Sequence, residues 1–303
     1  MADHVCSKPL TQVEEVCLDD AQPSPTMSLA LTSLPVELGD EPMDGCVLEG
    51  VLSDGECKRL LESAERSGFS FWDANGVSKR SLAVRNADTL EFECVSLCSV
   101  LWERLRAHVP ERVEISEEQP RFEPDLEGSW RACGLNTHLL LNRYGGGGHF
   151  APHVDGSTIV DFNRRSLYTV LLYLNECEEG GATQLLRAEQ GEATQTDGTG
   201  ASIARETFVV HAVRPVCGRG LLYWHQVLHA GERVGPSSVK YCLRTDVMYE
   251  RDPPICTEPN DVQAFELCQA ARALEANGRA MDALPLYMRA RKLSRGIAKA
   301  FRL

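Results

Sequence analysis

The stretch Thr137-His138-Leu139-Leu140-Leu141-Asn142-Arg143-Tyr144-Gly145-Gly146-Gly147-Gly148 decides the fold class, because a mainly apolar run of strand length ends there in a run of glycines. Short apolar runs broken by glycine-rich turns continue from about Trp130 to Tyr249. The other runs are Leu167 to Leu174, Phe208 to Val213, Gly220 to Trp224 and Val239 to Tyr249. Repeated short strands with turn signals predict a β-sandwich or jelly roll. The segment Arg187 to Thr207, rich in Gly, Thr, Gln and Glu, is predicted to be a long exposed loop of this domain.

A pair of potential metal ligands, His153 and Asp155, follows the glycine run. On a strand, residues i and i+2 project from the same face, so both side chains can bind one ion. A third ligand must come from a distant strand, and the apolar segment that starts at Leu221 offers His225 and His229. His149, directly after the glycines, is either a residue of the pocket rim or a plain loop histidine.

Two imidazoles and one carboxylate indicate a reaction class. This set binds one face of a non-haem Fe(II) ion and leaves the other face open for a co-substrate and O₂. A zinc hydrolase can use the same three ligands and is an alternative at this point.

The flanks of the β region carry helical patterns. Ser53 and Glu56 form a predicted capping box that opens a helix after the short strand from Cys46 to Leu52. A second helix is predicted from about Leu90 to His108, since apolar residues recur there at helical spacing. Residues 1–43 mix acidic residues, Pro, Ser and Thr without a sustained period, which predicts a disordered acidic tail.

The chain ends in a predicted helical hairpin, residues 257–303, with its turn at Asn277-Gly278. Ala283, Tyr287 and Ala290 in the second helix resemble a single tetratricopeptide repeat, although Pro285 and Arg295 depart from that pattern. One repeat alone cannot form a solenoid. The hairpin is therefore either packed on the β domain or a module that docks a partner protein.

Composition and charge exclude several function classes. The chain has 303 residues with 31 basic and 44 acidic side chains, a formal net charge of −13, which argues against a nucleic-acid partner. No segment has the length and apolar character of a membrane span or a signal peptide, so we expect no membrane association. Twelve cysteines without a C-x-x-C pair indicate buried thiols in a reducing compartment, and hence a cytoplasmic or nuclear protein.

Residues from about 46 to 249 resemble the prolyl 4-hydroxylase-type family of Fe(II)/2-oxoglutarate dioxygenases. The order and spacing of the matching motifs carry this resemblance, and they are Asn142-Arg143-Tyr144-Gly145, Phe150-Ala151-Pro152-His153-Val154-Asp155-Gly156, Tyr173-Leu174-Asn175, Glu179-Gly180-Gly181-Ala182-Thr183, Arg214-Pro215-x-x-Gly218, Leu228-His229-Ala230-Gly231 and Lys240-Tyr241-Cys242-Leu243-Arg244-Thr245-Asp246. The resemblance implies a mainly β (α+β) fold, with a double-stranded β-helix (jelly roll) core at about 130–249. N-terminal supporting helices complete a dioxygenase domain at 44–252, and the C-terminal helical hairpin follows it.

The resemblance also implies the ligands and the co-substrate. His153, Asp155 and His229 would bind Fe(II), because the Leu228-His229-Ala230-Gly231 step resembles the place of the family's distal histidine. His225 stays a minor alternative. A basic residue on the following strand binds the far carboxylate of 2-oxoglutarate in this family.

Lys240, 11 residues after His229, matches this basic position. Arg244 is an alternative four residues later on the same face of the strand, with a planar fork suited to a carboxylate. Tyr144 matches a position whose hydroxyl supports the co-substrate, and Thr183 is a further candidate for the lining of the same pocket.

The resemblance favours hydroxylation of a prolyl residue in a protein or peptide, with decarboxylation of 2-oxoglutarate to succinate and a requirement for L-ascorbate. A related dioxygenase that acts on another side chain or a small molecule is the alternative within the enzyme class. Outside it, a catalytically silent jelly-roll scaffold that binds partners through the hairpin would not need to keep the metal ligands or the basic residue.

Overall fold

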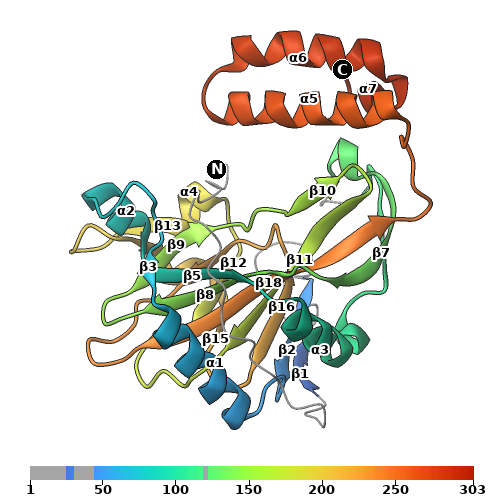
Figure 1. Ribbon diagram of the computed structural model, residues 1–303. Coiled ribbons are helices and arrows are strands. Elements are labelled where there is room, and N and C mark those ends of the chain that lie inside the picture. Colours follow the sequence, from blue (N-terminus) through green and yellow to red (C-terminus); the bar gives the residue numbers. More distant parts are fainter. Residues whose placement is uncertain (1–24, 31–43, 119–121) are drawn as a thin grey trace.

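The computed structural model describes residues 25–30, 44–118 and 122–303. Two antiparallel sheets face one another in the body of the molecule, and helices cover the outer face of the larger sheet (Figure 1). The larger sheet runs in the order β1 (Thr26–Ala30), β2 (Gly45–Glu49), β16 (Gly220–Trp224), β11 (Arg164–Tyr173), β18 (Lys240–Arg251), β8 (His138–Tyr144), β5 (Asp88–Glu93) and β3 (Ser70–Phe71). Off this path lie β10 (Ile159–Asp161), β7 (Gly128–Leu135) and β6 (Arg112–Ile115).

The smaller sheet completes the jelly-roll-like arrangement that the sequence predicted. Its order is β15 (Val209–Val213), β12 (Thr183–Leu186), β17 (His229–Gly231), β9 (His149–His153) and β4 (Arg85–Asn86). The predicted strand ends differ from the observed ones by at most three residues, and Gly220 to Trp224 matches at both ends.

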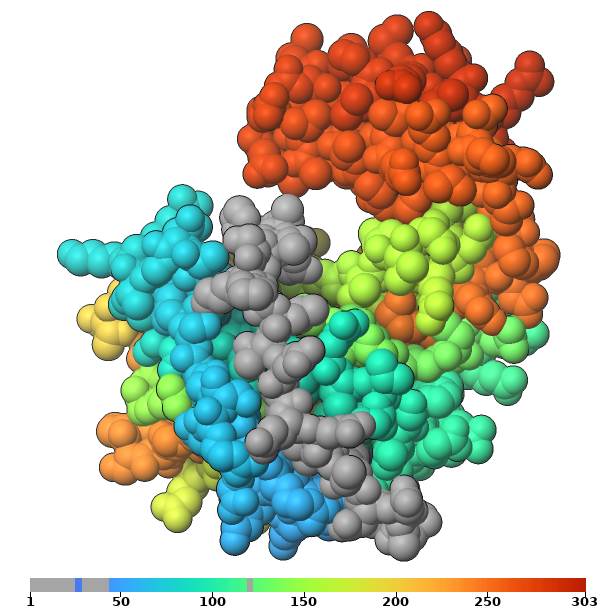
Figure 2. All heavy atoms as spheres, in the orientation of Figure 1, coloured from blue at the N-terminus to red at the C-terminus, as the bar shows by residue number. Residues whose placement is uncertain are grey.

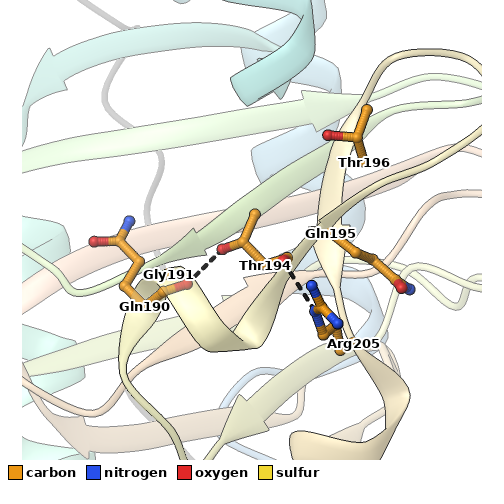
Figure 3. A pocket seen from close by; sticks show the side chains of 6 residues that line it. All are labelled: Gln190, Gly191, Thr194, Gln195, Thr196 and Arg205. Atoms are coloured by element: carbon orange, nitrogen blue, oxygen red, sulfur yellow. Dashed lines mark hydrogen bonds between the residues drawn. The ribbon is translucent and has the colours of Figure 1, made fainter.

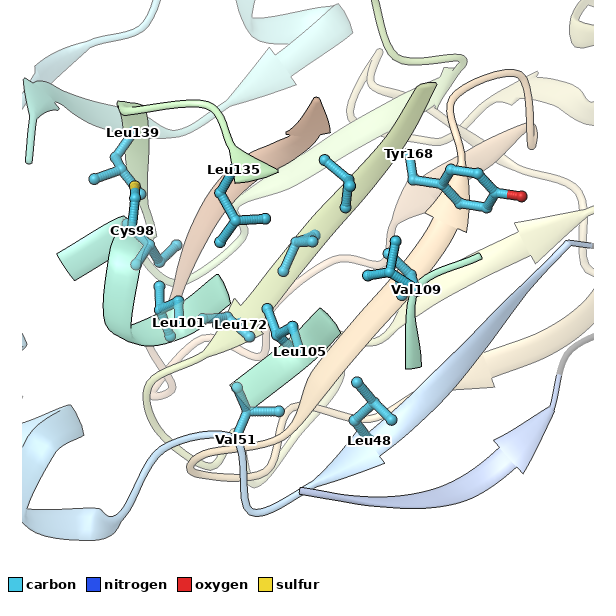
Figure 4. Close-up of a cluster of buried hydrophobic side chains, with 14 of the residues drawn as sticks. Leu48, Val51, Cys98, Leu101, Leu105, Val109, Leu135, Leu139, Tyr168 and Leu172 are labelled. Atoms are coloured by element: carbon cyan, nitrogen blue, oxygen red, sulfur yellow. The ribbon is translucent and has the colours of Figure 1, made fainter. Parts of the chain in front are cut away.

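The central strands of the larger sheet separate two groups of side chains. On β11, Tyr168, Val170 and Leu172 face outward into the main hydrophobic cluster, which the helices α1 (Asp54–Ser67) and α3 (Val95–Leu105) complete (Figure 4). Leu171 and Tyr173 face the other way, into the space between the sheets. Because the side chains of a strand alternate, this inner face can present polar groups without disturbing the main core.

The glycine run joins the two sheets where other residues cannot fit. A Cβ atom on Gly146 would lie 2.2 Å from the carbonyl oxygen of Pro236. Contacts under 3 Å are not tolerated by real side chains, so this glycine allows a close approach of two backbones. The run therefore fixes the turn from β8 to β9, the strand that carries His153.

The structure corrects the prediction of a helix from Leu90 to His108. Asp88–Glu93 is strand β5, paired with β8, and the helix α3 begins only at Val95. A single 3-10 turn, Arg106–His108, ends it. Leu90 and Phe92 are both buried while Glu93 is exposed, so the alternation of a strand, and not the helical spacing of Leu90 and Cys94, describes this segment.

Other segments confirm or correct the sequence reading. The capping box of Ser53 and Glu56 begins α1 as predicted. The predicted loop from Arg187 to Thr207 instead contains a short helix, α4 (Gln190–Ala193), and a hairpin of β13 (Thr194–Thr196) and β14 (Ser202–Ala204). Helix α2 (Lys79–Val84) and the 3-10 turns Pro124–Leu126 and Glu206–Phe208 complete the elements before the C-terminal region.

Part of the predicted disordered tail is a strand. Thr26–Ala30 forms β1 and pairs with β2, since the edge of β2 offers free backbone groups to an extended segment. The rest of the predicted tail, residues 1–24 and 31–43, lies outside the described residues.

The predicted C-terminal hairpin consists of α5 (Pro259–Ala276) and α6 (Ala280–Leu293), followed by the short helix α7 (Arg295–Ala300). Gly278 adopts a positive φ of 73° at the turn, and Pro285 lies inside α6. These helices form a lobe beside the body and are joined to it at one side (Figure 2). No helix in the described part of the chain combines the length and apolar character needed to cross a membrane.

Among the contacts that attach this lobe to the β domain, two involve buried residues of the body. Phe162, at the turn between β10 and β11, is 5% exposed and packs edge to face against Phe265, with ring centroids 5.4 Å apart. Arg272 donates two hydrogen bonds, of 2.8 and 2.9 Å, to the carboxylate of Asp125, which is 1% exposed. Arg165 binds the same carboxylate from β11. The lobe is therefore packed on the body, and a tetratricopeptide-like docking role stays a prediction.

We expect Arg272→Ala to lower the free energy of unfolding by about 1–2 kcal/mol. Loss of one partner from a buried pair costs about 3–5 kcal/mol, reduced here because Arg272 is more than a third exposed and Arg165 remains. Urea unfolding measures the change. The control is Arg279→Ala, since its exposed pair with Asp282 is worth less than about 1 kcal/mol. Equal effects of the two variants would contradict the attachment role of Arg272.

Candidate functional site

The three predicted metal ligands meet between the two sheets. His153 is the last residue of β9, and His229, the first residue of β17, is its direct partner in the register of the smaller sheet. Asp155 lies beyond the end of β9, where its N–H donates to the carbonyl of His225 at 3.0 Å. The pair therefore converges just past the end of β9, and not from two positions within one strand as the spacing predicts.

One ligand atom from each of His153, Asp155 and His229 lies within 4.8 Å of the other two. The Nε2 atom of His153 is 3.9 Å from one carboxylate oxygen of Asp155, and the Nε2 atom of His229 is 3.7 Å from the other. The two imidazole rings are 4.2 Å apart between centroids. Ligands bound about 2.0–2.2 Å from one ion have spacings of this size.

Backbone hydrogen bonds set the tautomer of both histidines. The Nδ1 atom of His153 lies 2.8 Å from the carbonyl of Ala151, and that of His229 lies 2.9 Å from the carbonyl of Val227. A carbonyl only accepts, so Nδ1 carries the hydrogen in each ring and Nε2 is left with a lone pair directed at the other ligands. Burial lowers the pKa of both imidazoles, which keeps them neutral. Two lone pairs and a carboxylate that converge in a buried space fit a divalent cation.

The carboxylate of Asp155 is held on both oxygens. The hydroxyls of Thr169 and Tyr223 each donate to Oδ2 at 2.7 Å. The Arg244 guanidinium lies 3.3 Å from Oδ1 and also binds Asp246. Burial alone would raise the pKa of Asp155, but the positive charge of Arg244 beside the carboxylate holds that pKa well below its usual range. Asp155 is therefore an anion.

The second predicted part of the site is the basic residue for the co-substrate. Lys240, the first residue of β18, is 3% exposed, and its ammonium lies 5.4 Å from the ring centroids of both Tyr144 and Tyr173. It forms no ion pair with any residue in the described ranges. Burial lowers its pKa. A buried ammonium between two aromatic faces, without a carboxylate of its own, fits an anionic ligand.

Tyr144 and Thr183 lie in the same region. Tyr144 pairs with Lys240 across β8 and β18, and burial raises its pKa to about 12, so its hydroxyl is a neutral donor. The hydroxyl of Tyr173 donates to Thr183 Oγ1 at 2.7 Å. Of the predicted co-substrate residues, Lys240 thus lies against Tyr144, and Thr183 is joined to them through Tyr173. Arg244 instead points to Asp155.

The sequence reading missed Tyr223 and Thr169 at the metal end. Both belong to strands that are buried on their two faces, so no alternation of polar and apolar residues marks the inner side. The register pairs Thr169 directly with Tyr223, and this pairing places both hydroxyls at Asp155. The two other histidines considered as candidates are not ligands in this arrangement. His149 lies at the start of β9, with its Nε2 atom near the carbonyl of Ala83. The ring of His225 contacts Thr169 on the side of Asp155 away from the other two ligands.

An open polar hollow borders the metal strand on the side of α4 and β13 (Figure 3). Its lining residues are Gln190, Gly191, Thr194, Gln195, Thr196 and Arg205. Gln190 donates from Nε2 to the carbonyl of Pro152, the residue before His153, at 2.7 Å. The segment predicted to be a long loop therefore packs on the strand that carries a ligand.

Comparisons with known proteins agree with this chemistry. Residues 139–245 match the sequence profile of the 2OG-Fe(II) oxygenase superfamily. No curated protein matches the chain. The chain therefore contains a 2OG-Fe(II) oxygenase domain, and the profile spans all three candidate ligands and Lys240.

Solved structures that align with the chain include three prolyl hydroxylases. A viral collagen prolyl hydroxylase from Paramecium Bursaria Chlorella virus-1, in complex with 2OG, aligns with a TM-score of 0.40 at 17% identity and covers 67% of this chain and 94% of its own. A prolyl-4-hydroxylase from Pseudomonas putida gives 0.40 and 16%, with 69% and 93% covered. A prolyl hydroxylase from Trichoplax adhaerens, in complex with a hypoxia inducible factor peptide fragment, gives 0.42 and 18%, with 69% and 84% covered.

Proposed function

We propose that this 2OG-Fe(II) oxygenase domain hydroxylates a prolyl residue of a protein or peptide. In the balanced reaction, substrate, 2-oxoglutarate and O₂ give hydroxylated substrate, succinate and CO₂. One observation carries the oxygenase part of this proposal. A three-ligand metal site and a buried lysine, which has no carboxylate partner among the described residues, both lie between the two sheets.

Fe(II), which the superfamily uses, would be held by His153, Asp155 and His229, and would supply O₂ activation coupled to decarboxylation of 2-oxoglutarate. The protein's own groups orient the reactants. Lys240 binds the far carboxylate of 2-oxoglutarate, and the Tyr144 hydroxyl donates to it. The surrounding apolar side chains exclude water, so that this charge pairing is strong.

The prolyl substrate is supported by the motif series from Asn142 to Asp246, which resembles prolyl 4-hydroxylases in order and spacing. The titles of the aligned structures name the same substrate class. As further parts of the proposal, L-ascorbate returns oxidised iron to the ferrous state, and the protein acts in the cytoplasm or nucleus.

Incubation of the full chain with Fe(II), ascorbate, 2-oxoglutarate and proline-containing peptides is expected to release succinate and to add one oxygen atom to a prolyl residue. Peptide fragmentation by mass spectrometry locates that atom. His153→Ala is the control, because it removes a metal ligand. Oxygen on another residue would contradict the prolyl assignment, and no succinate from the wild type under any condition would contradict the oxygenase activity.

A further inference from the structure

His225 is buried behind the metal site at the end of β16, and its two ring nitrogens are both engaged. The ring is 3% exposed. Its Nδ1 atom lies 2.9 Å from the hydroxyl of Thr169, and its Nε2 atom lies 2.8 Å from the hydroxyl of Ser166. Thr169 in turn donates to Asp155 Oδ2 at 2.7 Å. An unbroken series of hydrogen bonds thus leads from Ser166 through His225 to a metal ligand.

The direction of every bond in this series is fixed from the Asp155 end. An ionised carboxylate only accepts, so the single hydroxyl hydrogen of Thr169 is used on Asp155. The Thr169 oxygen must then accept from His225, which places a hydrogen on Nδ1. A neutral imidazole has only one N–H, so Nε2 accepts from the Ser166 hydroxyl.

The other end of the series is compatible with this direction. The backbone N–H of Thr158 donates to Ser166 Oγ at 2.7 Å, which leaves the Ser166 hydroxyl hydrogen available for His225. The Asp155 end therefore places the hydrogen on Nδ1, and the Ser166 end accommodates it.

Asp155 depends on His225 for its backbone as well. Because Asp155 lies past the end of β9, the strand ladder does not hold it, and its N–H donates instead to the His225 carbonyl at 3.0 Å. A carboxylate on a short side chain can otherwise rotate away from a metal. Groups behind a metal ligand that fix its orientation contribute to metal affinity.

We propose that His225 is a positioning residue that orients Asp155 toward the metal through Thr169, and that only its Nδ1 hydrogen is needed for this. The inference rests on the proposed function for the metal site. It assigns His225 a role without contact to the metal, the co-substrate or the substrate.

Two variants separate the roles of the ring nitrogens. In His225→Asn, the amide nitrogen takes the place of Nδ1 and can still donate to Thr169. In His225→Gln, the longer side chain carries its amide near the place of Nε2 and reaches Ser166 instead. We expect His225→Asn to bind metal nearly as tightly as the wild type, and His225→Gln and His225→Leu to bind about 10–100-fold more weakly. Anaerobic titration with Mn²⁺ or Fe²⁺ measures this without turnover.

A double-mutant cycle tests whether His225 acts through Thr169. Thr169→Val should weaken metal binding, Thr169→Ser should not, and His225→Leu should add little to Thr169→Val, since the shared link is already lost. His149→Leu is the matched control, because it removes another buried histidine that is not connected to Asp155. Its metal affinity should stay at the wild-type value.

Three results would overturn the inference. The first is equal loss of affinity in His225→Asn and His225→Leu, and the second is full additivity in the cycle. The third is unchanged affinity in all His225 and Thr169 variants, which would leave the proposed function intact provided that the wild type binds metal. A wild-type protein that binds no divalent metal would overturn both, so the two failures are distinguishable.

Discussion

Replacement of Asp155 by alanine is expected to weaken Fe(II) binding by more than about 100-fold, because loss of a ligand should exceed the 10–100-fold cost of changing a residue behind one. Asp155 supplies the only carboxylate of the three-ligand set among the described residues. Without it, two neutral imidazoles face a divalent cation while the Arg244 guanidinium remains nearby. Anaerobic titration of the purified protein with Fe(II) measures the affinity.

Asp155→Asn is the matched variant, since it keeps the shape and one oxygen but removes the charge. Both variants should abolish succinate formation, and Asp155→Asn should perturb thermal unfolding of the metal-free protein less than Asp155→Ala does. Iron binding of wild-type strength in either variant would refute the assignment of Asp155 as a ligand.

The second large effect is expected at Lys240. Lys240→Met should raise the KM for 2-oxoglutarate on the order of 100-fold, since truncating one partner of a buried charge pair costs about 2–5 kcal/mol. Methionine keeps most of the volume, so no large cavity forms. The ligand-free variant should lose no thermal stability, because a buried ammonium without a carboxylate partner is costly in itself.

Arg244→Met is the comparison for Lys240→Met. Arg244 already binds Asp155 and Asp246, so its removal should change the KM for 2-oxoglutarate much less. Steady-state succinate production at varied 2-oxoglutarate gives both values. If Arg244→Met has the larger effect on this KM, the two residues exchange roles.

The parts of the fold that the sequence predicted are those with a strong local pattern. Strands such as Gly220–Trp224 are continuous apolar runs between turns, and the capping box at Ser53 is a local hydrogen-bond pattern. The part of strand β5 from Leu90 onward is predicted as helix from the sequence, because Leu90 and Cys94 also fit helical spacing. The hairpin of Thr194–Thr196 and Ser202–Ala204 is too short and polar to be distinguished from a loop.

Within the site, the ligands were predictable and their surroundings were not. His153, Asp155 and Lys240 stand in motifs of fixed spacing, so a linear pattern identifies them. Tyr223 and Thr169 come together only through the pairing of β11 with β16, which a linear pattern does not encode. The distinction between Lys240 and Arg244 also needed the structure, since both face inward from β18 and only their partners differ.

Strand β11 touches both ends of the space between the sheets, with Thr169 at Asp155 and Tyr173 beside Lys240. Four residues of extended chain separate these contacts by roughly 13 Å, and the strand is bonded to β16 and β18 along both edges. The paired strand therefore holds the distance between these two contacts fixed. The site should therefore accept dicarboxylic acids shorter or longer than 2-oxoglutarate poorly. A mutation in a surface loop should not change this selectivity for length.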